Sequence, residues 1–113
     1  MNKGLRATSK GKYSKALKLF SKSIKIDSTN LDSYLNRGTA YNDLELFDLN
    51  LKDYNFLISK KYNNPDLYYN LGKNYYDLNE LNKSLEFYNI AISINSSNID
   101  YYNNKGITLL DLK

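Results

Sequence analysis

The sequence predicts an all-α protein built as a stack of antiparallel helix-turn-helix repeats. A motif returns every 34 residues, in segments that read YLNRGTAYNDL at 34–44, YYNLGKNYYDL at 68–78 and YNNKGITLLDL at 102–112. A fixed period of this length is typical of stacked supersecondary units. Within each period, apolar and small residues recur three, four or seven positions apart, which places them on one face of a helix.

The first period covers residues 1–30 and is expected to be partial. Its glycine, Gly4, is in register with Gly38, Gly72 and Gly106. A second helix is predicted from an apolar stripe at helical spacing, formed by Ala16, Leu17, Phe20 and Ile24. The other side of that helix carries four lysines, which we interpret as a solvated face: Lys15, Lys18, Lys22 and Lys25.

Two complete periods follow, at residues 31–64 and 65–98. The first helix of each carries a tyrosine-glycine stripe, at Tyr34, Gly38 and Tyr41 and then at Tyr68, Gly72 and Tyr75. Just ahead of the first helices stand Asn30, Asn64 and Asn98, whose side-chain oxygens can accept from unpaired backbone N–H groups, so all three are predicted N-caps. Pro65 falls at the first helical position, where its missing N–H costs nothing.

The last segment, residues 99–113, holds only the first helix of a fourth period. A repeat cannot bury both of its faces alone, so each end of the stack needs a cap. We expect residues 1–10 to cap one end and residues 99–113 to form a solvating cap at the other.

These recurring residues resemble the tetratricopeptide repeat, a helix-turn-helix unit with an aromatic, Leu-Gly, Tyr, Ala, Phe or Tyr, Ala, Pro signature. The signature positions fall on Tyr34, Gly38, Tyr41 and Tyr54 in one period and on Tyr68, Gly72, Tyr75 and Tyr88 in the next. The family's closing proline is replaced by Ser28, Tyr62 and Ser96. Asn50 stands where the family has a small residue, and we expect it to loosen its hairpin. Lys105, at a usual leucine position, fits a last helix with its outer side in water.

The resemblance covers essentially the whole chain. It implies one domain over residues 1–113, wound as a right-handed superhelical stack in which the first helices line a concave groove. Because the groove of such repeats binds an extended peptide or a partner helix, the resemblance implies a non-enzymatic protein-interaction scaffold.

Composition argues against several other classes of function. The chain has no Cys and no His, which removes the usual ligands of zinc and most general bases. There is no P-loop, no Gly-x-Ser-x-Gly motif and no metal-ligand spacing, so we predict no cofactor, no metal and no enzymatic activity. No apolar run approaches the roughly 20 residues of a membrane span, and the N-terminus lacks a secretory signal. An intracellular, cytoplasmic location is the default expectation.

The candidate binding residues lie opposite the tyrosine-glycine stripe of each first helix. A rotation of about 100° per residue places a polar stripe there. Its members are Asp32, Asn36, Thr39 and Asp43, then Asp66, Asn70, Lys73 and Asp77, and finally Asp100, Asn104, Ile107 and Asp111, of which only Ile107 is apolar. Tyr69 and Tyr76 fall between this stripe and the core, where each can stack on a ligand side chain.

A structural role competes with binding at some of these positions. Asp32 and Asp66 lie in the first turn of their helices, where the macrodipole stabilises a negative charge by about 0.3–1 kcal/mol without any ligand. Asp43 and Asp77 lie near helix C-termini, where the same dipole disfavours them. Helix stability therefore does not account for the second pair, and ligand contact gains weight there.

The acidic stripe predicts a partner segment that bears Lys or Arg near Asp43, Asp66 and Asp77. A chaperone carboxylate tail is not expected, because the family's clamp needs basic residues where this chain has Asp66 and Asn70, or Asp100 and Asn104. Nucleic acid is not expected either, since the lysine face of the first period carries no aromatic residue and no arginine. The structural alternative is a spacer or self-associating segment of a larger solenoid.

Overall fold

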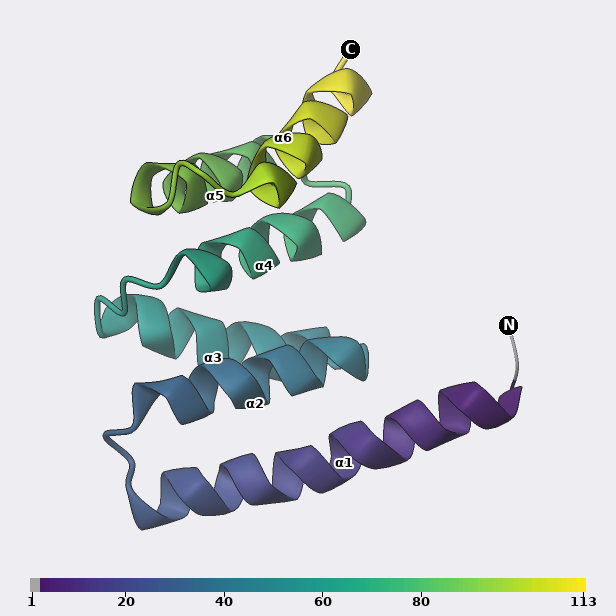
Figure 1. The fold of residues 1–113 in the computed structure, drawn as a ribbon, viewed down its shortest axis with the longest axis vertical. Coiled ribbons are helices and arrows are strands. Elements are labelled where there is room, and N and C mark those ends of the chain that lie inside the picture. The colour runs from purple at the N-terminus through teal and green to yellow at the C-terminus, as the bar shows by residue number, and fades with distance from the viewer. Residues whose placement is uncertain (1–2) are drawn as a thin grey trace. The chain divides into compact units, whose positions relative to one another are not determined.

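The computed structural model describes the backbone of residues 3–113 and the side chains of residues 10–113, and every regular element in this part is an α-helix (Figure 1). The helices are α1 (Lys3–Ile26), α2 (Leu31–Asp43), α3 (Phe47–Ser59), α4 (Pro65–Asp77), α5 (Leu81–Ile94) and α6 (Ile99–Asp111). The all-α prediction is confirmed. The chain divides into two compact regions, with α1 to α3 in residues 1–62 and α4 to α6 in residues 63–113.

The helix α1 is continuous over 24 residues, as Figure 1 shows. The helix expected around Ala16 and Phe20 is present, but it has no turn on its N-terminal side because Gly11 keeps a helical backbone. The lysine face is exposed as predicted, at Lys15, Lys18, Lys22 and Lys25. The expected cap depends on side chains of residues 1–9, which lie outside the described residues.

The α2–α3 hairpin is closed by an aromatic ring lying on a glycine. A Cβ added to Gly38 would meet Tyr54 Cε1 at 2.7 Å, and Tyr54 is 0% exposed. Asn50 is also fully buried, and its Nδ2 donates to the Gly38 carbonyl at 2.6 Å. The expectation that Asn50 loosens this hairpin is wrong, because the amide reaches a backbone acceptor and so satisfies its buried polar group.

The α4–α5 hairpin repeats this arrangement with other residues. A Cβ on Gly72 would meet Tyr88 Cε1 at 2.5 Å, and Ser84 Oγ donates to the Gly72 carbonyl at 2.7 Å. Leu71 and Tyr88 are each 1% exposed. In both hairpins a side chain larger than hydrogen at the glycine would push the tyrosine ring away.

The helix boundaries follow the predicted punctuation. Asn30, Asn64 and Asn98 are the N-caps of α2, α4 and α6. The side chains of Asn64 and Asn98 accept from the backbone N–H of Asp66 and Asp100, each at 2.9 Å, while Asn30 makes no such bond. Pro65 occupies the first turn of α4, where no backbone donor is lost.

Candidate functional site

The candidate site is the face shared by α4 and α6 in residues 63–113, called here the α4–α6 surface. The two helices are in contact. Three hydrogen bonds that join them each connect residues 35 positions apart: Tyr101 with Asp66, Asn104 with Tyr69, and Tyr76 with Asp111. A residue of α4 and the residue 34 positions later occupy equivalent positions on α4 and α6. The residue 35 positions later is rotated by about 100° around the α6 axis, so that its side chain points toward α4.

Tyr101 anchors the first of these bonds. Its hydroxyl donates to Asp66 Oδ1 at 2.8 Å, and its side chain is 1% exposed. Burial, followed by the hydrogen bond to Asp66, raises the pKa of Tyr101 to about 12. Asp66 therefore makes two hydrogen bonds, since its backbone N–H also donates to the side-chain oxygen of the N-cap residue Asn64. These hydrogen bonds give Asp66 a structural role besides its place in the first turn of α4, and the residue is still exposed.

Tyr69 is half-buried at the centre of the surface. Its ring lies 4.8 Å from the Tyr101 ring and 6.0 Å from the Tyr88 ring, measured between centroids. Its hydroxyl accepts from Asn104 Nδ2 at 2.7 Å, and Lys73 Nζ lies 4.7 Å from its ring centroid. Burial and then the charge of Asp100 raise the pKa of Tyr69. These contacts restrict the motion of the Tyr69 ring, which forms an ordered aromatic surface between the carboxylates.

The C-terminal end of the surface is more open. Tyr76 donates its hydroxyl to Asp111, and this hydrogen bond raises the pKa of Tyr76. Asp77 and Asp111 are exposed, and each is the last residue of its helix. Neither helix has a basic residue in its last turn. Because a helix C-terminus disfavours negative charge, these carboxylates add local negative potential that the fold does not neutralise.

The predicted site residues are divided between the two regions. Seven of them lie on α4 and α6, where the structure brings them onto one helix pair: Asp66, Tyr69, Asn70, Lys73, Tyr76, Asp77 and Asn104. The other three, Asp32, Asn36 and Asp43, are exposed on α2, in residues 1–62. Asp32 accepts a hydrogen bond from the Tyr62 hydroxyl. The acidic residues in the first turns, Asp32, Asp66 and Asp100, are where the sequence placed them.

Sequence reasoning missed two contributors. Tyr101 was not among the predicted site residues because the equivalent positions hold Ser33 and Leu67, so no repeated tyrosine marks it. The hydrogen bond between Tyr76 and Asp111 was missed because the sequence period relates residues that are 34 positions apart, whereas these two residues are 35 positions apart. The offset of one period plus one residue is the signal that finds both.

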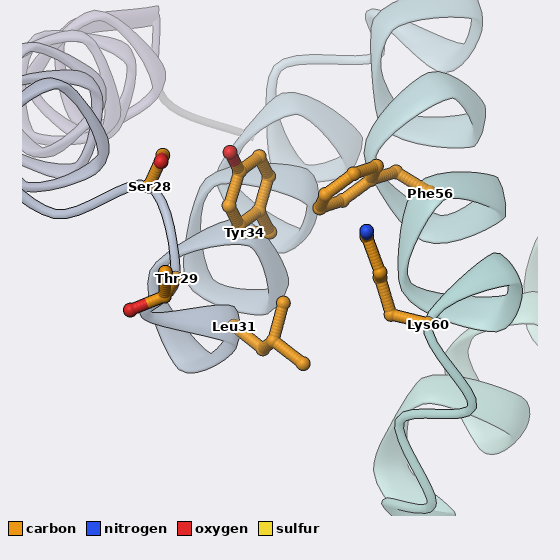
Figure 2. A pocket seen from close by; sticks show the side chains of 6 residues that line it. All are labelled: Ser28, Thr29, Leu31, Tyr34, Phe56 and Lys60. Carbon is orange, nitrogen blue, oxygen red and sulfur yellow. The ribbon is translucent and has the colours of Figure 1, made fainter.

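A hollow lies within residues 1–62 and is lined by the six residues in Figure 2: Ser28, Thr29, Leu31, Tyr34, Phe56 and Lys60. The rings of Tyr34 and Phe56 face each other with centroids 4.5 Å apart, and Lys60 Nζ lies 5.6 Å from the Phe56 centroid. Thr29 Oγ1 is already bonded to Asp27. These contacts join α2 and α3 at the end of the hairpin.

The described residues contain no group of three or more acidic, His or Cys residues placed to hold a metal ion. None of the helices described is both long and apolar enough to cross a membrane.

The chain belongs to the tetratricopeptide repeat family. The family model described as TPR repeat matches residues 4–44 and 72–113, most of the chain. No curated protein with which the sequence was compared matches it.

Solved structures show the same fold at low sequence identity. The first TPR domain of human RPAP3 is 23% identical, with a TM-score of 0.82 over 97% of this chain and 87% of that one. MamA is 22% identical, with a TM-score of 0.79 over 99% of this chain and 66% of that one, so the chain spans just under two thirds of MamA. The Yersinia enterocolitica secretion chaperone SycD, solved with a peptide of the translocator YopD, is 15% identical, with a TM-score of 0.79 over 97% and 93%.

Proposed function

We propose that the protein is a non-enzymatic interaction module and that the α4–α6 surface binds a partner segment bearing Lys or Arg. One observation carries this proposal: four carboxylates, Asp66, Asp77, Asp100 and Asp111, are exposed on the α4 and α6 helices. Only Lys73 among the predicted site residues offers a positive charge to offset them, and its ammonium group lies over the Tyr69 ring.

The fixed polar groups suit a peptide in an extended or helical form. The Tyr69 ring is locked between Tyr88 and Tyr101, so little side-chain entropy is lost when a ligand packs on it. Asn104 lies beside it and offers its Oδ1 as an acceptor for a peptide backbone, while its Nδ2 already donates to the Tyr69 hydroxyl and the Asp100 carbonyl. Carboxylates at both ends of the surface then select for basic side chains and speed association at low salt.

Peptide complexes among the structural neighbours support the general mode of binding. The first TPR of Spaghetti (RPAP3) was solved with the HSP90 peptide SRMEEVD, and SycD with a YopD peptide. The HSP90 peptide has three acidic residues, whereas the surface here is itself acidic. We therefore expect this chain to prefer basic peptides and to reject an acidic tail of that kind.

The test uses two synthetic peptides of equal length, one with alternating Lys and Ala and one with alternating Glu and Ala, together with SRMEEVD. Fluorescence anisotropy at several salt concentrations measures their binding to the chain. We expect the Lys peptide to bind and the two acidic peptides not to bind. The double variant Asp66→Asn, Asp77→Asn should weaken Lys-peptide binding by about tenfold and flatten its salt dependence.

The control variant removes the same charge elsewhere. Asp48 on α3 and Glu86 on α5 are both exposed, so Asp48→Asn, Glu86→Gln changes net charge equally but leaves the α4–α6 surface intact. Equal loss of binding in both double variants would show that net charge, and not this surface, attracts the peptide. Micromolar binding of SRMEEVD at physiological salt would also contradict the proposal.

A further inference from the structure

The aromatic ring at the centre of the α4–α6 surface already carries a cation of its own chain. Lys73 Nζ lies 4.7 Å from the centroid of the Tyr69 ring. Lys73 follows Tyr69 by four residues on α4, so the two side chains lie on the same face of one helix. The negative face of an aromatic ring attracts a cation in this position. The surface therefore holds a cation site that is occupied from within.

The two members of this contact differ in how firmly they are held. The Tyr69 ring contacts Tyr88 on α5 and Tyr101 on α6, and its hydroxyl accepts from Asn104. Lys73 is partly exposed, and its ammonium group lies against the ring. A cation–π contact at a partly exposed site is weak, and a lysine regains rotamer freedom when it leaves. A cation from a partner can therefore displace Lys73 without moving the ring.

A carboxylate lies near the hydroxyl end of the same ring. Asn104 Nδ2 donates to the Tyr69 hydroxyl at 2.7 Å and to the Asp100 backbone carbonyl at 3.0 Å, which places Asp100 next to Tyr69. Burial, and then the charge of Asp100, raises the pKa of Tyr69, as expected for a carboxylate close to its hydroxyl. Asp100 is exposed, and so is Asp66, the equivalent residue of α4, on which α6 packs. A ligand on the ring can thus reach a carboxylate as well.

The same chain shows which side chain uses tyrosine rings and a carboxylate together. The Arg37 guanidinium lies 5.6 and 5.8 Å from the ring centroids of Tyr34 and Tyr41, and it donates to both oxygens of Asp53. A planar guanidinium can stack on a ring and donate two parallel hydrogen bonds, whereas an ammonium group acts as a point charge. A lysine from a partner would replace Lys73 by an equal group, but an arginine adds a two-point hydrogen bond.

We propose that an arginine of the partner replaces Lys73 on the Tyr69 ring and donates to the Asp100 carboxylate. This assignment rests on the function proposed above for the α4–α6 surface, because it names the basic side chain that the surface prefers. Lys73 is then an internal competitor that occupies the ring in the free protein. Each partner must displace it, and a partner that offers only lysine gains less from doing so.

The first test compares two peptides of equal length, one with alternating Arg and Ala and one with alternating Lys and Ala. Fluorescence anisotropy at physiological salt measures their binding to the chain. We expect the Arg peptide to bind at least about threefold more tightly, because a guanidinium can combine the ring with two hydrogen bonds to Asp100. Asp100→Asn should reduce this preference while both peptides still bind. Equal affinities of the two peptides for the unmodified chain would overturn the proposal.

Two changes at position 73 have opposite expected effects. Lys73→Ala clears the ring and introduces a good helix former, so the Arg peptide should bind about two- to fivefold more tightly. Lys73→Arg keeps the charge but places a guanidinium on the ring, so the Arg peptide should bind about twofold less tightly. Net charge alone predicts no change in Lys73→Arg. An unchanged affinity in either variant would contradict displacement.

The matched control is a lysine over another tyrosine. Lys83 on α5 is exposed, and its Nζ lies 5.1 Å from the centroid of the Tyr75 ring. Lys83→Ala removes the same charge and the same kind of contact outside the α4–α6 surface, so the affinity for the Arg peptide should change by less than about twofold. Equal gains in Lys83→Ala and Lys73→Ala would assign the effect to net charge and overturn the proposal.

Nuclear magnetic resonance of the chain with isotope-labelled lysine follows the displacement. The ε-methylene groups of Lys73 and Lys83 both lie near tyrosine rings, so ring currents should shift both signals, and Lys73→Ala identifies the Lys73 signal by its loss. Saturation with the Arg peptide should return the Lys73 signal to the position of exposed lysines and leave the Lys83 signal unchanged. If the peptide binds and the Lys73 signal stays shifted, the displacement is wrong and the proposed function stands. If neither peptide binds, both fail.

Discussion

In the α2–α3 hairpin Arg37 pairs with Asp53, whereas in the α4–α5 hairpin the equivalent residues are Leu71 and Phe87. The guanidinium donates to both carboxylate oxygens, at 2.8 and 2.7 Å, with the Asp53 side chain 5% exposed. The Phe87 ring instead lies near Tyr68 and Tyr75, with centroids 6.3 and 5.4 Å away. Arg37 occupies the corresponding space between Tyr34 and Tyr41, about 5.6 and 5.8 Å from their rings.

The repeat therefore fixes the volume that side chains fill beside the glycine–tyrosine contact. It does not fix whether those side chains are charged or apolar. The aromatic ring on glycine is the same in both hairpins, and the buried donor to the glycine carbonyl is Asn50 in one and Ser84 in the other. An ion pair and an apolar pair fill the same flanking space. The two pairs respond differently when one partner is removed. Removal of one partner of the ion pair leaves a buried charge, whereas removal of one partner of the apolar pair leaves only a smaller apolar contact.

The largest expected effect comes from breaking the ion pair on one side. Arg37→Leu leaves the Asp53 carboxylate buried without its cation and should destabilise residues 1–62 by about 3 kcal/mol, the lower end of the range for buried pairs. Urea unfolding followed by circular dichroism measures the loss. Lys52→Leu removes an exposed lysine from the same hairpin and should change stability by less than about 0.5 kcal/mol.

The double variant Arg37→Leu, Asp53→Phe converts the first hairpin to the chemistry of the second. Tyr34 and Tyr41 are already in place to receive the ring, so most of the stability lost in Arg37→Leu should return. If the double variant is as unstable as the single one, an apolar pair cannot replace the ion pair in the α2–α3 hairpin, and the two hairpins do not offer the same space.

The next effect in size concerns the glycines. Gly38→Ala and Gly72→Ala force a methyl group against Tyr54 or Tyr88 and should each cost about 1–3 kcal/mol, because overpacking shifts the ring or the helix. Gly11→Ala and Gly106→Ala meet open space and should stabilise by up to about 1 kcal/mol, through helix propensity alone. Thermal unfolding of the four variants at one low concentration measures whether stability falls in the first two and rises in the last two. The same change in all four would mean that the tyrosine rings do not pack closely on Gly38 and Gly72.

A further effect is absent at neutral pH and appears only in alkali. Burial raises the pKa of Tyr88 to about 12, as it does for Tyr101, while an unfolded tyrosine titrates near 10. Between these values the unfolded state loses protons that the folded state keeps, so the stability of residues 63–113 should fall as pH rises from about 10 to 12. Ultraviolet absorbance of tyrosinate, recorded with urea unfolding, measures both changes. Tyr101→Phe should reduce the pH dependence, and an unaltered profile would exclude Tyr101 from it.

Much of the fold could be predicted from the sequence because its signals are local and repeated. Asn64 and Pro65 set the start of α4 from within one turn, and the tyrosine-glycine stripe follows from helical spacing. The same logic misjudged Asn50, since a polar residue at a small position reads as poor packing until its backbone acceptor is known. It also gave no reason to expect α1 to continue through Gly11, a residue equally suited to a helix or a turn in this context.

The candidate site was only partly predictable. Helical phase put seven of the predicted residues on two segments that are helices α4 and α6 in the structure, and their binding role stays a prediction. It could not show that Tyr69 would be held by Asn104 and two rings. Nor could it pair Tyr101 with Asp66. Which residue of one helix reaches the next depends on the rotation between packed helices, and a period read along one chain does not contain that angle.

The sequence by itself determined the period, the helix starts and the aromatic-glycine seams, because each depends on backbone capping and on spacing within one or two turns. Only the tertiary structure decided the partners: Arg37 with Asp53, and Tyr101 with Asp66. Hydrogen bonds and close packing act over a few ångströms between segments far apart in sequence. They therefore become visible only when the helices have been brought together.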